Sequence, residues 1–207
     1  MKKGNIPQVV IPPLSLYYRT LLESRSSDFI SSEEIAEQSG VTAAQVRKDL
    51  AYFGQFGEAG KGYHIDALKQ SIIKILGTDK SWSVALVGVG NFGSALLSYK
   101  GFSKQGFKIT CAFDSDLRKI GKSLEGVTVK DISELEFEAK LNKVNMGIVT
   151  VPQAMAQEAV DKLVKTGIKA ILNFAPVRPR APDGVKILNI DLSIELERLA
   201  YFLTCST

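Results

Sequence analysis

The chain has 207 residues, of which 45% are hydrophobic and 23% charged, and its net charge is +4, as in an ordinary globular protein with a sizeable core. No apolar run is long enough to span a membrane, and the first five residues lack the apolar core of a signal peptide, so we expect a cytoplasmic protein with no membrane partner. Two cysteines and one histidine are too few for a disulfide framework or a zinc site, so we expect no metal.

Residues 1–13 contain three prolines and a glycine, and this composition predicts an irregular arm. From Leu14 to Ser24 the apolar residues recur at helical spacing, which predicts an amphipathic helix that carries Arg19 on its side.

Two helix start signals follow in close succession. Ser31 with Glu34, and Thr42 with Gln45, have the spacing of a capping box, in which the side chains at the two positions satisfy free N–H groups of the first turn. The first of these helices is predicted to end near Gly40, since glycine takes the left-handed conformation that closes a helix.

The helix that starts at Thr42 is predicted to extend to about Phe53, with Gln45, Arg47 and Lys48 on its outer face. Two capped helices joined by a short glycine-containing turn have the layout of a helix-turn-helix. Residues 54–63 then alternate glycine with aromatic residues, which predicts the β-hairpin wing of a winged helix. DNA binding is our interpretation; the alternative is a helical docking domain whose charges are simply solvated, because neither half of the chain is a basic block.

An apolar stripe from Asp66 to Leu76 predicts a connecting helix, and the polar run 77–80 after it marks a domain boundary, so residues 1–77 form one domain. Strands and helices then alternate, which predicts an α/β domain over residues 78–191 with a doubly wound parallel sheet of Rossmann type. The predicted strands are Val84–Val87, Lys108–Phe113, Val127–Lys130, Met146–Val151, Ala170–Asn173 and Ile187–Ile190.

Directly after the first of these strands, Gly88, Gly90 and Gly93 have the G-x-G-x-x-G spacing of a dinucleotide-binding turn. The N–H groups at the start of the following helix favour an anion such as a pyrophosphate. The cofactor-binding residues predicted in this loop are Gly88, Val89, Gly90, Asn91, Phe92 and Gly93.

Asp114 ends the second strand about twenty residues past the last glycine, where this fold places an acid on the ribose 2′-OH. Together with Asp116 it would repel a 2′-phosphate, so we expect NADH or NAD⁺ rather than the phosphorylated cofactors. The alternative is a plain glycine turn followed by a solvated acid.

The later strands end in residues that could line the nicotinamide side of the crevice, because ligands of such sheets bind at the carboxyl ends of the strands. These residues are Val151 and Pro152 at the end of the fourth strand and Asn173 and Phe174 at the end of the fifth. The prolines near these positions could instead serve only to end the strands.

Residues 192–207 are predicted to form a C-terminal helix rich in leucine, isoleucine, tyrosine and phenylalanine. This is more apolar surface than an exposed tail helix should carry, so we expect a partner subunit to cover it.

Over nearly its full length the chain resembles the Rex family of redox-sensing transcriptional repressors. The stretches that carry the resemblance are Leu16–Arg19, Val46–Gly54, Gly60–Tyr63, Gly88–Tyr99, Ala112–Asp114, Thr150–Pro152, Gly167–Pro176 and Asn189–Asp191.

The resemblance implies a homodimer with swapped C-terminal helices whose paired winged helices bind a palindromic operator. In such proteins NADH releases the DNA, so the repressor reports the ratio of NADH to NAD⁺. The DNA-binding set is then Gln45, Arg47, Lys48 and Tyr52 of the recognition helix with Lys61 of the wing.

The resemblance also implies an interdomain relay, in which Tyr99 and Arg19 are alternative partners of Asp191 across the dimer. One departure concerns the N-terminal arm. The family often has a basic residue just before the position of Leu14, where this chain has Pro13, so the resemblance does not carry over the phosphate contact of that basic residue.

Two rival functions remain open at the level of sequence. One is an NAD-dependent dehydrogenase with an N-terminal appendage, although no substrate domain follows the sixth strand and the single histidine, His64, lies at the wing, so we expect no enzyme. The other is a protein-docking module that binds a nucleotide only structurally.

Overall fold

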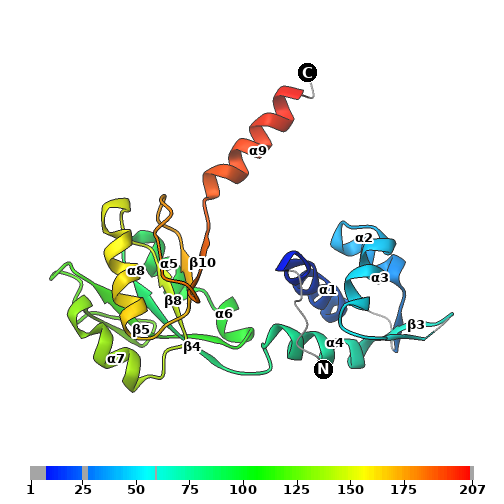
Figure 1. The fold of residues 1–207 in the computed structure, drawn as a ribbon, viewed down its shortest axis with the longest axis horizontal. Helices are drawn as coiled ribbons and strands as arrows, with labels where there is room; N and C mark the ends of the chain where they lie inside the picture. The colour runs from blue at the N-terminus through cyan, green and yellow to red at the C-terminus, as the bar shows by residue number, and fades with distance from the viewer. Residues whose placement is uncertain (1–7, 25–27, 59, 206–207) are drawn as a thin grey trace. The chain divides into compact units, whose positions relative to one another are not determined.

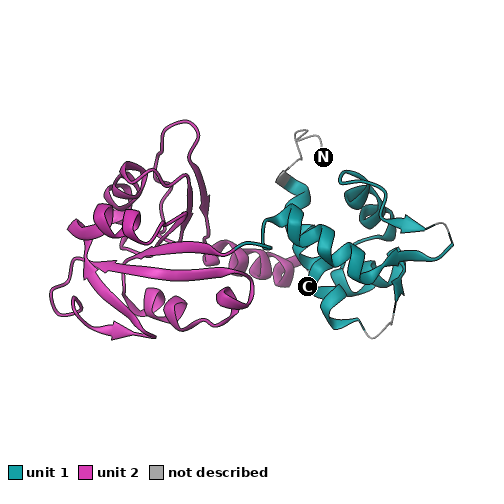
Figure 2. Cartoon of the chain, turned by 90° about the horizontal axis from the view of Figure 1, so that it is seen from below, with its two compact units in different colours: residues 1–80 teal, residues 81–207 magenta. Residues whose placement is uncertain are grey.

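The computed structural model describes residues 8–24, 28–58 and 60–205. The chain divides into two compact units, residues 1–80 and residues 81–207 (Figure 2). The division falls in the polar run where the sequence places a boundary, and the C-terminal helix belongs to the second unit.

The first unit packs four helices against a small sheet. The helices are α1 (Ile11–Glu23), α2 (Ser32–Ser39), α3 (Ala43–Ala51) and α4 (Ile65–Leu76), and a 3-10 turn, η1 (Gln8–Val10), precedes α1. The strands β1 (Phe29–Ile30), β2 (Gly57–Glu58) and β3 (Gly62–His64) form an antiparallel sheet in the order β1-β3-β2. This is the predicted winged helix, with one more strand, β1, than the sequence indicated.

The irregular arm predicted for residues 1–13 is wrong over the described part, because residues 8–10 form η1 and α1 begins at Ile11. Pro12 and Pro13 lie in the first turn of α1, where the missing N–H groups would have no partner within the helix and the fixed φ suits helical backbone. Residues 1–7 lie outside the described residues.

The helix ends follow the predicted caps. Ser31 and Glu34 make a complete capping box at the start of α2, and Gly40 closes that helix at φ +67°. Thr42 caps α3 by accepting from the backbone N–H of Gln45, but the Gln45 side chain does not return the bond, so the second capping box is only half formed.

The second unit is a seven-stranded sheet with helices on both faces (Figure 1). Its elements are β4 (Trp82–Val87), α5 (Asn91–Ser98), α6 (Gly101–Lys104), β5 (Phe107–Asp114), β6 (Ser123–Leu124), β7 (Val127–Asp131), η2 (Ile132–Glu134), α7 (Leu135–Leu141), β8 (Met146–Val149), η3 (Gln153–Met155), α8 (Ala156–Lys165), β9 (Ala170–Asn173), β10 (Lys186–Asn189) and α9 (Leu192–Cys205). The order is β10-β9-β8-β4-β5-β7-β6, and all pairs are parallel except β6 with β7.

Without the short β6, this strand order is that of the Rossmann fold, as the sequence predicts. The chain runs from β4 to β5 and β7 on one side and then returns to place β8 on the other side of β4. Residues of β4 alternate between the two faces: Ala85 and Val87 pack toward α7 and α8, whereas Val84 and Leu86 pack toward α5. The carboxyl end of β4 is therefore the topological switch point, where this fold opens a crevice.

Candidate nucleotide site and DNA-reading surface

A cavity of about 550 Å³ opens at the carboxyl ends of β4, β5 and β8. Of the predicted cofactor residues, those that line it are Gly88, Gly90, Asn91, Phe92, Asp114, Val151 and Pro152. The structure therefore brings together side chains and backbone from three strand ends, which lie at Val87, Asp114 and Val149 in the sequence.

The three glycines of the loop have different surroundings. Gly88 has φ +96°, and a Cβ on it would lie 2.8 Å from a methyl group of Val151. A Cβ on Gly93 would lie 2.1 Å from the carbonyl oxygen of Gly88, so α5 packs on the loop only because residue 93 has no side chain. A Cβ on Gly90 would meet nothing within 4 Å, so this backbone is open on the cavity side to a bound group.

The start of α5 points an uncapped helix end at this cavity. Gly90 is the N-cap residue and supplies no side-chain acceptor, while Asn91 and Phe92 in the first turn line the cavity. The unpaired N–H groups and the positive end of the helix dipole suit a phosphate.

Asp114 is buried at the end of β5 and holds the loop. Its carboxylate accepts from the N–H of Val89 at 2.7 Å and from Nζ of Lys119 at 2.9 Å, and also from the N–H of Asp116 at 2.9 Å. Burial alone would raise the pKa of Asp114, but these hydrogen bonds outweigh it and hold the pKa below its usual value. The carboxylate is therefore ionised and fixed at the position predicted for a ribose contact.

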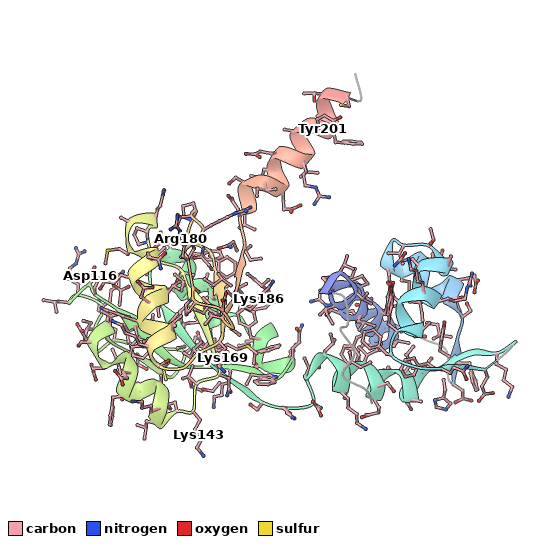
Figure 3. All side chains as sticks on the ribbon, viewed as in Figure 1. Asp116, Lys143, Lys169, Arg180, Lys186 and Tyr201 are labelled. Carbon is pink, nitrogen blue, oxygen red and sulfur yellow. The ribbon has the colours of Figure 1, made fainter. Side chains whose placement is uncertain are left out.

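The charge of this acid pair is not free, contrary to what the sequence suggested. Lys119 forms an ion pair with Asp114, and Arg118 forms one with Asp116 at 2.9 Å. Asp116 lies on the exposed loop after β5 (Figure 3). Because both carboxylates are paired with cations, they would repel a 2′-phosphate less strongly than the sequence alone predicted.

Among the cavity-lining residues that sequence reasoning missed, Lys119 and Thr150 make contacts that shape the site. Lys119 lines it beside Asp114. Thr150, directly after β8, donates its hydroxyl hydrogen bond to the carbonyl oxygen of Gly88 at 2.6 Å and so fixes the glycine loop to the neighbouring strand. The signal for Thr150 was its place at a strand's carboxyl end beside the predicted Val151.

The two residues predicted at the end of β9, Asn173 and Phe174, have different roles. Asn173 is fully buried, and its amide group bonds Ala175, Val177 and Asn189, so it organises the loop and does not line the cavity. Phe174 contacts Phe92 edge to face, with 4.9 Å between ring centroids. These two rings line a second hollow of about 190 Å³ that also includes Asp191 and the first residues of α9.

Of the predicted DNA-binding residues, three lie on the exposed face of α3, Tyr52 directly follows that helix as its C-cap, and Lys61 lies on the wing. Gln45, Arg47, Lys48, Tyr52 and Lys61 are all exposed. Arg47 donates from Nη1 to Oγ of Ser32 at 2.6 Å and to Oε1 of Glu33 at 3.0 Å, and Lys61 pairs with Glu58 at 2.9 Å. Exposed pairs of this kind contribute little stability, so both cations can exchange their partners for phosphates or bases.

The three predicted relay residues, Arg19, Tyr99 and Asp191, are all exposed. Asp191 caps the first turn of α9 by accepting from the N–H and the hydroxyl of Ser193, and these bonds hold its pKa below the usual value. The Tyr99 ring packs on Phe102 and leaves no room for a Cβ at Gly101, where the nearest ring atom would be 2.4 Å away. Arg19 lies on α1 of the other unit, so the relay stays a prediction.

α9 stands clear of the sheet (Figure 1), and none of its residues is buried. Its exposed apolar side chains include Leu196, Leu199 and Phe202, each more than 60% accessible, and Tyr201 (Figure 3). Water contact on this scale is costly for an isolated helix.

His64 has a structural role, because its Nδ1 accepts from the N–H of Ala67 at 3.5 Å and its ring packs edge-on against Phe29. Among the described residues no three histidine, cysteine, aspartate or glutamate side chains are grouped to hold a metal ion. Within the same residues, no helix combines the length and the apolar character needed to cross a bilayer.

Two known protein families match this chain, one for each compact unit. Residues 5–51 match a family model described as putative DNA-binding protein N-terminus, and residues 79–177 match one described as CoA binding domain. The chain is 50% identical over 203 residues to the redox-sensing transcriptional repressor Rex of Desulfitobacterium hafniense, covering 97% of each chain. It is 46% identical over 207 residues to that of Syntrophobacter fumaroxidans, covering 99% of each.

Solved structures of RSP, a Rex-family repressor, have the same fold over the whole chain. The complex of RSP with β-NAD⁺ and operator DNA superposes with a TM-score of 0.92 at 39% identity, covering 99% of this chain and 95% of that one. The complex with β-NADH gives 0.88 at 37% identity, covering 99% and 97%.

A winged helix joined to a dinucleotide-type domain defines the class of ligand-responsive transcriptional regulators. The curated relatives are repressors and not enzymes, so the dehydrogenase alternative falls away. The chain belongs to the Rex family of redox-sensing transcriptional repressors.

Proposed function

We propose that this protein binds a palindromic operator in the cytoplasm as a homodimer and that NADH releases it. The observation that carries the proposal is the cavity at the glycine loop, which leaves the backbone of Gly90 open beside a free helix end. The relatives' solved complexes with NADH and with NAD⁺ and operator DNA support the same cofactor and the same partner.

In this proposal the pyrophosphate binds between Gly90 and the start of α5, because the N–H groups there have no other acceptor within the helix. The adenosine ribose binds at Asp114, whose carboxylate is ionised and able to accept from a hydroxyl. The nicotinamide end extends past Phe92 toward Phe174, where the second hollow reaches Asp191.

The DNA contacts belong to α3 and the wing. Arg47 and Lys48 lie on the exposed face of α3 and can reach guanine acceptors or phosphates in the major groove. Lys61 lies on the wing and binds the phosphate backbone of the DNA. Dimer symmetry then requires half-sites roughly 34–36 Å apart, or a multiple of that distance.

The homodimer is proposed from α9, because a second copy of the chain is the partner that would cover its apolar side chains. The hollow that ends at Asp191 includes the first residues of α9, so the cofactor's nicotinamide end and the dimer contact share an element. A change at the ring can therefore bias two arrangements of the dimer, with Tyr99 and Arg19 as the alternative partners of Asp191.

The test is operator affinity measured by fluorescence anisotropy at fixed ionic strength, on a duplex selected from a random pool by the purified protein. We expect NADH to weaken binding about 5- to 150-fold, the range for a coupling of about 1–3 kcal/mol, and NAD⁺ to preserve it. Equal affinity with NADH absent and saturating would refute the proposal. Failure to enrich any palindrome would favour the protein-docking alternative.

A further inference from the structure

Asp49 is a buried carboxylate in the last turn of the proposed recognition helix, α3. Only 2% of its surface is exposed, and it faces the apolar core of the first unit. It accepts from the hydroxyl of Tyr17 on α1 at 2.8 Å and from Nε2 of Gln45, one turn earlier on α3, at 2.6 Å. The three side chains form a continuous line of hydrogen bonds from the core to the exposed face of α3.

Both neighbours donate to Asp49, the Tyr17 hydroxyl to one carboxylate oxygen and the Gln45 amide to the other. Burial, with the hydrogen bond to Asp49 and its charge, raises the pKa of Tyr17, so the hydroxyl keeps its proton. For Gln45 the consequence is geometric. Its NH₂ group must face Asp49, and this removes the ambiguity between the two ends of a side-chain amide.

With one N–H used by Asp49, the Gln45 amide has its Oε1 and its second N–H left for another partner. A neighbouring acceptor and donor are what the major-groove edge of adenine complements, through its N6 amino group and N7. If the amide were reversed, it would present two donors outward and favour guanine or thymine acceptors instead.

We propose that Tyr17 and Asp49 are positioning residues that fix the amide of Gln45 for adenine, and so set the base preference at one position of each half-site. The proposal rests on the proposed contact of Gln45 with DNA. A buried carboxylate whose donors are two neutral side chains is costly to desolvate, and such a group is often retained for specificity rather than stability.

The experiment is selection of bound duplexes from a random pool, using the full-length protein without NADH. Wild type is compared with Tyr17→Phe, Asp49→Asn and Gln45→Ala. Tyr18→Phe is the matched control, because it removes a hydroxyl from the adjacent, half-buried position of α1 outside this line of hydrogen bonds. Thermal unfolding is recorded for each protein.

We expect wild type to prefer adenine at one position per half-site by about 5- to 150-fold, and Gln45→Ala to lose that preference while keeping the rest of the operator. Asp49→Asn should reduce the preference nearly as far, because an asparagine can accept or donate and so permits both orientations of the Gln45 amide. Tyr17→Phe should reduce it several-fold, and Tyr18→Phe should leave it unchanged.

The proposal is overturned if Gln45→Ala changes the selected base but Tyr17→Phe does not, because the amide is then oriented without the line to the core. If Gln45→Ala leaves the selected sequence unchanged, the DNA contact itself is refuted. Should Asp49→Asn fail to fold, the comparison of Tyr17→Phe with Tyr18→Phe decides. A uniform loss of affinity with the base preference intact would indicate a purely structural role.

Discussion

At the scale of single residues, substitutions at Gly90 and Gly93 separate the effect on cofactor binding from the effect on folding. A side chain at residue 90 enters open space on the cavity side, so we expect Gly90→Val to fold normally and to bind operator while losing its response to NADH. Gly93→Ala is the matched contrast: its Cβ would collide with the carbonyl oxygen of Gly88, and we expect a loss of about 1–3 kcal/mol or more in the free energy of unfolding.

Calorimetric titration with NADH and thermal unfolding separate these two outcomes. A Gly90→Val protein that still binds NADH with wild-type affinity would move the pyrophosphate away from this loop. A fully stable Gly93→Ala protein would show that α5 can shift on the strand ends.

The ion pair of Asp114 with Lys119 predicts how the site discriminates between NADH and NADPH, which differ by a phosphate on the 2′ oxygen of the ribose. Asp114→Asn removes the charge that holds Lys119 and the acceptor for the ribose hydroxyl, so we expect NADH affinity to fall roughly tenfold or more. The freed Lys119 can then bind a 2′-phosphate, so the ratio of NADH affinity to NADPH affinity should fall. Glu136→Gln is the control, because it removes the same charge from an exposed side chain that is paired with Lys140 and does not line the cavity. Unchanged selectivity in Asp114→Asn would place the ribose elsewhere.

At the scale of elements, local signals in the sequence predicted most of the structure. The box at Ser31 and the glycine at residue 40 set the ends of α2, because caps act within one turn. β1 and β6 have two residues each, too few for an alternating pattern, and they exist because neighbouring strands pair with them. The prolines of residues 12 and 13 suggested a break and instead lie in a helix's first turn.

For the candidate site, too, the sequence predicted the residues that local spacing determines and missed those that depend on contacts between elements. The glycine loop and Asp114 were predicted because spacing along one chain segment determines them. Thr150 and Lys119 were missed since their roles come from contacts across the sheet and the loop. Asn173 ends a strand as predicted, but its amide is used by the loop that follows and by Asn189 of β10, which spacing alone could not reveal.

The exposed apolar side chains of α9 predict that this helix holds the proposed homodimer together. We expect Leu196→Glu combined with Phe202→Glu to shift the protein from dimer to monomer in sedimentation, because burying two carboxylates in an apolar contact is costly. Operator affinity should fall with it, since each protomer binds one half-site. Glu197→Gln, on the same helix, is the control and should stay dimeric. A dimer that survives the double substitution would mean that another surface holds the two copies.

At the scale of the whole molecule, the cofactor site and the DNA-reading surface lie in separate compact units, so any effect of one on the other is a coupling free energy. Such coupling is reciprocal. If NADH weakens operator binding by a given factor, saturating operator must weaken NADH binding by the same factor, taken as the product over the two cofactor sites of the proposed dimer. We expect this product to be about 5–150, which corresponds to about 1–3 kcal/mol in total.

Two titrations at one ionic strength measure both sides of this equality: operator affinity with and without NADH, and NADH affinity with and without operator. The Gly90→Val protein is the control for the first titration, and a duplex of unrelated sequence is the control for the second. Because non-specific binding depends steeply on salt, equal factors at two salt concentrations would separate the coupling from the electrostatic background. If operator binding changes with NADH while NADH affinity ignores the operator, the two measurements violate the linkage, and the loss of DNA binding must come from aggregation or inactivation rather than from a shift between two states of the dimer.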